Sequence, residues 1–72
     1  MDAAPPTQQQ LNKAAAYLML AATHEQQRNE SASHKAIDLA ALELGITPEG
    51  DRYFLWGSAR AIIELAKQTQ ES

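Results

Sequence analysis

The 72-residue sequence contains no cysteine and no valine, and it has only three glycines and three prolines. Without cysteine, the chain can form neither a disulfide framework nor a thiolate metal site, which are common supports of very small domains. Strands are enriched in β-branched and aromatic side chains, so the missing valine and the presence of only four aromatic residues argue against a β-sheet. A chain of this length has room for one domain.

Long apolar runs and an excess of positive charge are also missing. No stretch approaches the roughly 18 consecutive apolar residues of a membrane span. The first residues have neither the basic nor the apolar region of a signal peptide. We therefore expect a cytoplasmic protein with no membrane partner. Nine acidic residues against six basic ones give a net charge of −3, which disfavours nucleic acid as the main partner.

Helix-forming residues are abundant, with fourteen alanines, eight leucines and seven glutamines. Residues 1–6 contain two adjacent prolines and predict a disordered N-terminal leader, and residues 7–72 predict a single helical domain. The segment Thr7–Gln10 matches a capping box, in which the threonine and the last glutamine bond each other's backbone amides. Apolar residues recur at three- and four-residue spacing from Leu11 onward, so we expect the first helix at 8–28.

Two further helices are predicted. Ser33 is the expected N-cap of a second helix at 34–44, and Gly45 follows it as the left-handed residue that ends many helices. Pro48 suits the first position of a helix, which predicts a tight turn and a third helix at 48–69. The fold class we expect is therefore an all-α three-helix bundle.

The third helix has more apolar surface than one packing face needs. We expect its core face along Leu55 and Ile62, with Phe54 beside them, whereas Trp56 and Ile63 form a second stripe. A chain of this size buries only about 60% of the surface that its unfolded form exposes. We interpret the second stripe as an interface, most simply that of a homodimer. The alternative is one crowded core that takes in the tryptophan.

The interface interpretation predicts how the protein works. Large aromatic residues and arginine dominate binding hot spots, and the first helix has a similar apolar excess outside its main stripe. The expected partner-binding residues are Tyr53, Trp56, Arg60, Ile63, Tyr17 and Leu20. We expect a regulator, adaptor or inhibitor that occupies a groove of a protein partner. The acidic charge favours a basic partner, with a nucleic-acid-binding protein as a special case.

One segment offers an alternative function. The alanine, leucine, glycine and isoleucine of Ala41-Leu42-Glu43-Leu44-Gly45-Ile46-Thr47 resemble the end of the first helix in the helix-turn-helix motif of DNA-binding proteins. The resemblance implies a small transcriptional regulator that places the predicted second and third helices on duplex DNA, with Arg52 as the base-reading cation. The second helix of the motif has a buried aliphatic residue where this sequence has Asp51.

The sequence contains no clear catalytic or metal-binding constellation. His34 and Asp38 lie four residues apart, which places them on one helix face, but a metal site needs three or four ligands. The acidic residues are spread along the chain rather than paired for acid and base catalysis. We therefore expect no enzymatic activity, no metal and no cofactor.

Overall fold

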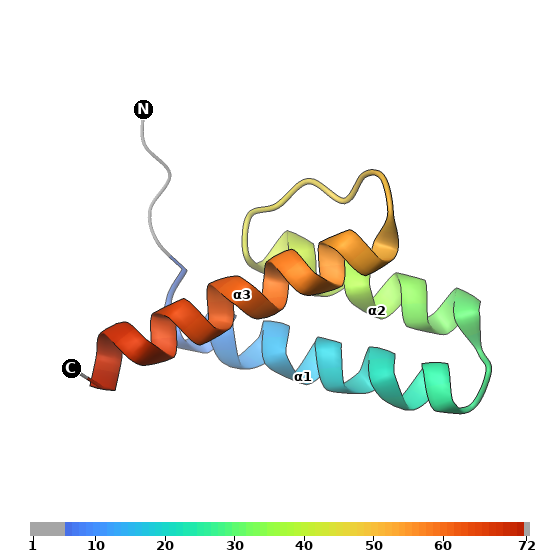
Figure 1. The fold of residues 1–72 in the computed structure, drawn as a ribbon, viewed down its shortest axis with the longest axis horizontal. Helices are drawn as coiled ribbons and strands as arrows, with labels where there is room; N and C mark the ends of the chain where they lie inside the picture. Colours follow the sequence, from blue (N-terminus) through green and yellow to red (C-terminus); the bar gives the residue numbers. More distant parts are fainter. Residues whose placement is uncertain (1–5, 72) are drawn as a thin grey trace.

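The computed structural model describes residues 6–71. These residues form three α-helices, α1 (Gln8–Gln26), α2 (Glu30–Glu43) and α3 (Arg52–Glu71), and contain no strand. The predicted all-α class and three-helix bundle are confirmed. α1 and α2 form an antiparallel hairpin, and α3 crosses the hairpin on its way back along α1 (Figure 1). The predicted disordered leader lies outside the described residues, except for Pro6.

The start of α1 carries the predicted capping box. Thr7 Oγ1 accepts a hydrogen bond from the Gln10 amide at 3.1 Å, and Gln10 Oε1 accepts one from the Thr7 amide at 2.8 Å. Two of the amides that a helix start leaves without partners are thereby satisfied. The local sequence alone therefore fixes where α1 begins.

The connection between α1 and α2, residues 27–29, is shorter than predicted. Arg28 has a left-handed φ of 60°, which ends α1 before the predicted residue 28 and lets the Asn29 amide donate to a carbonyl in the last turn at 2.8 Å. Asn29 also caps α2, since its Oδ1 accepts a hydrogen bond from the Ala32 amide at 3.3 Å. The prediction of Ser33 as the cap was wrong, because Ser33 lies buried inside α2.

The end of α2 follows the prediction to within one residue. Gly45 has a φ of 78°, a conformation that glycine adopts without strain. The chain then turns back, so that the Ile46 amide donates to the Ala41 carbonyl at 2.8 Å, and the Ile46 side chain packs against the core. This is the left-handed helix end with a hydrophobic closure that the sequence indicated.

The predictions of a tight turn after α2 and of a helix start at residue 48 were wrong. The connection spans residues 44–51, and α3 begins at Arg52. Gly50 has a φ of 80°, so the helical conformation cannot extend back through it to Pro48. Asp51 instead caps α3, because its Oδ1 accepts a hydrogen bond from the Tyr53 amide at 2.9 Å.

The core is built from small and aliphatic side chains of all three helices. Buried alanines lie on each helix, which allows close approach of the backbones. The first cluster contains Leu11, Ala14, Leu18, Ala40, Leu44, Ala59 and Ile63. The second contains Ala21, Ala36, Ile37, Ala41 and Leu55. Ile46 and Trp56 pack against both clusters and so join them into one core.

The core face of α3 is broader than predicted, because it includes Ile63 of the second stripe beside the expected line, from which Ile62 also packs against the core. Leu55 is buried as expected, but the buried isoleucine is Ile63, which is 6% exposed, while Ile62 is only partly buried. Phe54, expected beside the core, is 73% exposed. The reason is that α3 packs against α1 as well as α2, and this turns the flank of Trp56 and Ile63 inward. Periodicity alone could not choose between the two apolar flanks.

Candidate functional site

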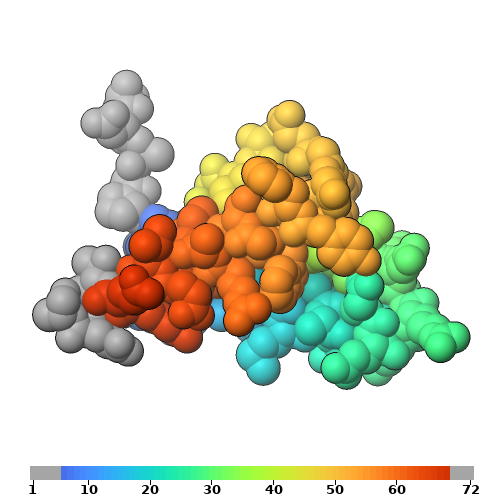
Figure 2. All heavy atoms as spheres, viewed as in Figure 1, coloured from blue at the N-terminus to red at the C-terminus, as the bar shows by residue number. Residues whose placement is uncertain are grey.

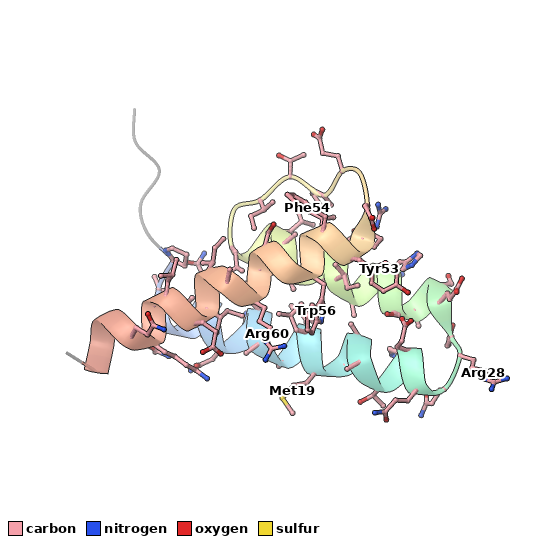
Figure 3. All side chains as sticks on the ribbon, in the orientation of Figure 1. Met19, Arg28, Tyr53, Phe54, Trp56 and Arg60 are labelled. Atoms are coloured by element: carbon pink, nitrogen blue, oxygen red, sulfur yellow. The ribbon has the colours of Figure 1, made fainter. Side chains whose placement is uncertain are left out.

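A groove runs between α1 and α3, and we refer to it as the α1/α3 groove. It consists of two hollows of about 220 and 290 Å³, and Trp56 lines both of them. Figure 3 shows this side chain pointing from α3 toward α1 with Arg60 beside it, whereas Met19 extends outward from α1. In the space-filling view, the first half of α3 lies directly above the middle of α1 on this face (Figure 2). The groove therefore lies on the surface, over the line where the two helices meet.

The groove has an apolar floor and a partly charged rim. The floor of the larger hollow contains buried Leu18 and Ile63 and partly buried Ala15. Alanines on the α1 side leave the space that larger side chains would fill. The exposed rim of this hollow consists of Met19, Ala22, Arg60, Glu64 and Lys67. The smaller hollow is lined by Ala21, Ala22, Glu25, Ile37, Tyr53 and Trp56.

Trp56 is held from two sides. Its ring packs against both core clusters, and the guanidinium carbon of Arg60 lies 5.3 Å from the ring centroid on the exposed side. Arg60 is one helical turn beyond Trp56, so the α-helix itself places the cation over the ring. The indole is thus fixed in position, and this partly buried side chain lines both hollows.

Glu25 links all three helices at one end of the groove. Its Oε1 accepts a hydrogen bond from the Tyr53 hydroxyl of α3 at 3.1 Å, and its Oε2 accepts one from Ser33 Oγ of α2 at 3.3 Å. The hydrogen bond to Glu25, and then the negative charge of Glu25, raise the pKa of Tyr53 above its ordinary value of 10.0. Glu30 and Asp51 add smaller contributions in the same direction. This end of the groove is therefore acidic.

An ion pair fixes the start of α3 against α2. Arg52 Nε lies 2.9 Å from Asp38 Oδ1, and Arg52 Nη1 donates to the Gly50 carbonyl at 2.9 Å. Both charged side chains are partly exposed. Because Tyr53 follows directly and Trp56 lies one turn further on, this pair helps to set the direction in which both aromatic side chains point.

The structure brings four of the six predicted partner-binding residues to the groove and leaves two away from it. The four are Tyr53, Trp56, Arg60 and Ile63. Ile63 belongs to the buried floor, so it is not the exposed anchor that the sequence analysis expected. Tyr17, predicted as a partner-binding residue, is instead partly buried against the first core cluster and lines neither hollow. Leu20 is 46% exposed and lines neither hollow.

Sequence reasoning missed the α1 side of the groove. Met19, which is 72% exposed, and Glu25 were not predicted as site residues. The available signal was the stripe of Ala15, Met19 and Ala22, which repeats at four and three residues beside the main apolar stripe of α1. Small residues flanking a large exposed one on a helix indicate a surface on which another side chain can lie.

Other kinds of site find little support in the described residues. Among them, no three histidine, aspartate or glutamate side chains gather closely enough to hold a metal ion. Over the same part of the chain, no helix has the length and hydropathy needed to cross a membrane. The connection 44–51 is longer than the three- or four-residue turn of a helix-turn-helix. Comparison with known proteins gives no family model, curated protein or solved structure that matches this chain.

Proposed function

We propose that this chain is a cytoplasmic, non-enzymatic protein-binding domain, acting as a regulator, adaptor or inhibitor, and that its α1/α3 groove binds a helix of a protein partner. One observation carries the proposal: an apolar groove with Trp56 between two hollows and the exposed Met19 on the rim. Soluble domains rarely leave such a combination of a large aromatic ring, a flexible methionine and empty apolar space without a use.

The shape of the groove suits a helical partner. In helix-in-groove recognition, apolar side chains about one turn apart enter successive hollows. The two hollows share Trp56 as a common wall, so adjacent turns of a partner helix would both contact this side chain. Because the core and Arg60 already hold this ring, little side-chain entropy is lost on binding.

The charge of the chain favours a basic partner surface. A net charge of −3 steers association toward positive surfaces, including those that otherwise hold nucleic acid. Inhibition of a nucleic-acid-binding protein is therefore a special case of this function. The charge affects mainly the rate of association, whereas the groove determines how long the complex lasts.

Photo-crosslinking from the groove tests the proposal. A photo-reactive amino acid replaces Met19 in one variant and Leu42 in the control variant, since Leu42 is 58% exposed on α2 and lines neither hollow. Both variants are irradiated in the cells that naturally produce the protein. We expect discrete crosslinked protein products from position 19 and none of the same mass from position 42.

Two outcomes would contradict the proposal. One is the absence of any discrete product from position 19 in a variant that retains its helical circular dichroism. The other is the same set of products from both positions, which would indicate contact without a preferred surface. A salt-sensitive gel shift of duplex DNA that Arg52→Ala and Arg60→Ala abolish would instead support the DNA-binding alternative.

A further inference from the structure

We propose that the partner held in the α1/α3 groove is a second copy of this chain, docked antiparallel about a twofold axis close to Trp56. This inference rests on the proposed function, because it names the partner of the same groove.

One end of the groove is acidic. Glu25 lines the smaller hollow, and Glu30 and Asp51 lie close enough to Tyr53 for their charges to act on its hydroxyl group. Glu25 is thus the charged residue that lines this hollow, and none of the described basic residues lines it. The hydrogen bond from Tyr53 to Glu25 uses one carboxylate oxygen and leaves the negative charge in place.

The other end of the groove is basic. Arg60 and Lys67 lie on the rim of the larger hollow, and Glu64 is the acidic residue that lines it. All three side chains are exposed, so their charges are available to a docked molecule. The groove thus has opposite net charges at its two ends, although the chain as a whole is acidic.

A groove with this charge pattern is complementary to itself. In an antiparallel pair, the acidic end of each copy lies over the basic end of the other, so the favourable contact is made twice. A parallel pair would instead place like charges together. Twofold pairs in which both subunits use the same patch are the commonest form of oligomer. The net charge of −3 favours basic surfaces, but a partner that is basic throughout would match only the acidic end of the groove.

Met19 supplies the side chain for the apolar contact. It lies on the groove rim, is 72% exposed, and borders the same hollow as Trp56. In the twofold arrangement, Met19 of each copy faces the partner's groove, where its thioether can contact an aromatic ring. Burying both methionines against both tryptophans would cover the most exposed apolar part of the groove.

The test is the solution mass of the purified full-length chain, measured by light scattering over a range of micromolar concentrations at moderate salt. We expect the wild type to reach about twice the chain mass of 7.9 kDa. Met19→Glu changes an exposed side chain and is expected to raise the dimer dissociation constant at least roughly tenfold by placing charge in an apolar contact. Phe54→Glu, an equally exposed apolar position outside the groove, is the matched control and should remain dimeric.

A charge exchange tests the antiparallel arrangement. The variant Arg60→Glu with Lys67→Glu has two acidic ends, and the variant Glu25→Lys with Glu30→Lys has two basic ends. Each should be monomeric alone, and an equimolar mixture should form a heterodimer. A monomeric wild type overturns the second copy as partner, as does a dimer that Phe54→Glu disrupts and Met19→Glu does not. If the wild type is monomeric while position 19 crosslinks to a different protein, the proposed function stands and only this inference fails.

Discussion

Arg28 is the one non-glycine residue among residues 6–71 with a positive φ. A side chain with a Cβ carries a steric cost of roughly 1–2 kcal/mol in the left-handed region, which glycine avoids. We expect Arg28→Gly to raise the free energy of unfolding by about 1 kcal/mol and Tm by about 4–8 °C, measured by thermal circular dichroism. The neighbouring substitution Gln27→Gly is the control and should lower Tm, because Gln27 has a φ of −85° and gains nothing from glycine. A fall in Tm for both variants would contradict this explanation.

Tyr53 makes the acidic end of the groove sensitive to alkaline pH. Its hydroxyl donates to Glu25, and this bond and the nearby carboxylates raise the pKa of Tyr53 above 10.0. The folded state therefore holds this proton more tightly than the unfolded state does. The resulting stabilisation is present below pH 10 and is lost as the pH rises through the folded pKa.

Ultraviolet titration of the tyrosinate band measures this effect. The difference between the wild type and Tyr53→Phe isolates Tyr53 from Tyr17, and it should give a midpoint above 10.0. Glu25→Gln removes the charge and is expected to lower that midpoint. A midpoint for Tyr53 that does not change in Glu25→Gln would mean that the hydrogen bond is absent in solution.

At the scale of whole helices, the orientation of α3 decides which side chains form the core. Ile63 is buried, whereas Ile62 is partly buried and Phe54 is exposed. We expect Ile63→Ala to lower the free energy of unfolding by about 2–5 kcal/mol. Ile62→Ala should lower the free energy of unfolding by clearly less. For Phe54→Ala, this free energy should stay within about 0.5 kcal/mol of the wild-type value. Urea unfolding followed by circular dichroism measures all three, and a larger loss for Ile62→Ala than for Ile63→Ala would reverse the assigned face.

The ion pair between Asp38 and Arg52 gives a second test at this scale. Because both side chains are partly exposed, the coupling free energy between them should be roughly 0.2–1 kcal/mol. A double-mutant cycle with Asp38→Ala and Arg52→Ala measures it, and the coupling should shrink in high salt as screening increases. A coupling that is absent at low salt would mean that the pair does not help to position α3.

The ends of the helices differ in how well the sequence predicted them. The capping box at Thr7 and the left-handed Gly45 were predicted, because each depends only on neighbours in the chain. The start of α2 was missed, since Asn29 both closes α1 and caps α2, and a left-handed Arg28 has no sequence signature. Asp51 was passed over as a cap because the preceding proline suggested an earlier start.

For the molecule as a whole, the groove depends on how α3 crosses α1, and no local pattern encodes that angle. The aromatic side of the groove could be predicted, because Trp56, Tyr53 and Arg60 stand out in composition and lie on one helix. The α1 side could not, because Met19 becomes a rim residue only once α3 lies beside it. Residues that share a helix are related by sequence spacing, whereas residues on two helices are related by packing.

The short connection 27–29 also bears on how the chain reaches its fold. The most extensive contact between helices joins α1 and α2, which are neighbours in sequence, and α3 is attached through fewer contacts. A topology dominated by such local contacts has a low contact order, for which folding takes about microseconds to milliseconds. The hairpin and α3 should therefore behave as two units of unequal protection in hydrogen exchange. We expect the amides of α3 to exchange before those of the hairpin, and every opening of α3 would separate the two sides of the groove.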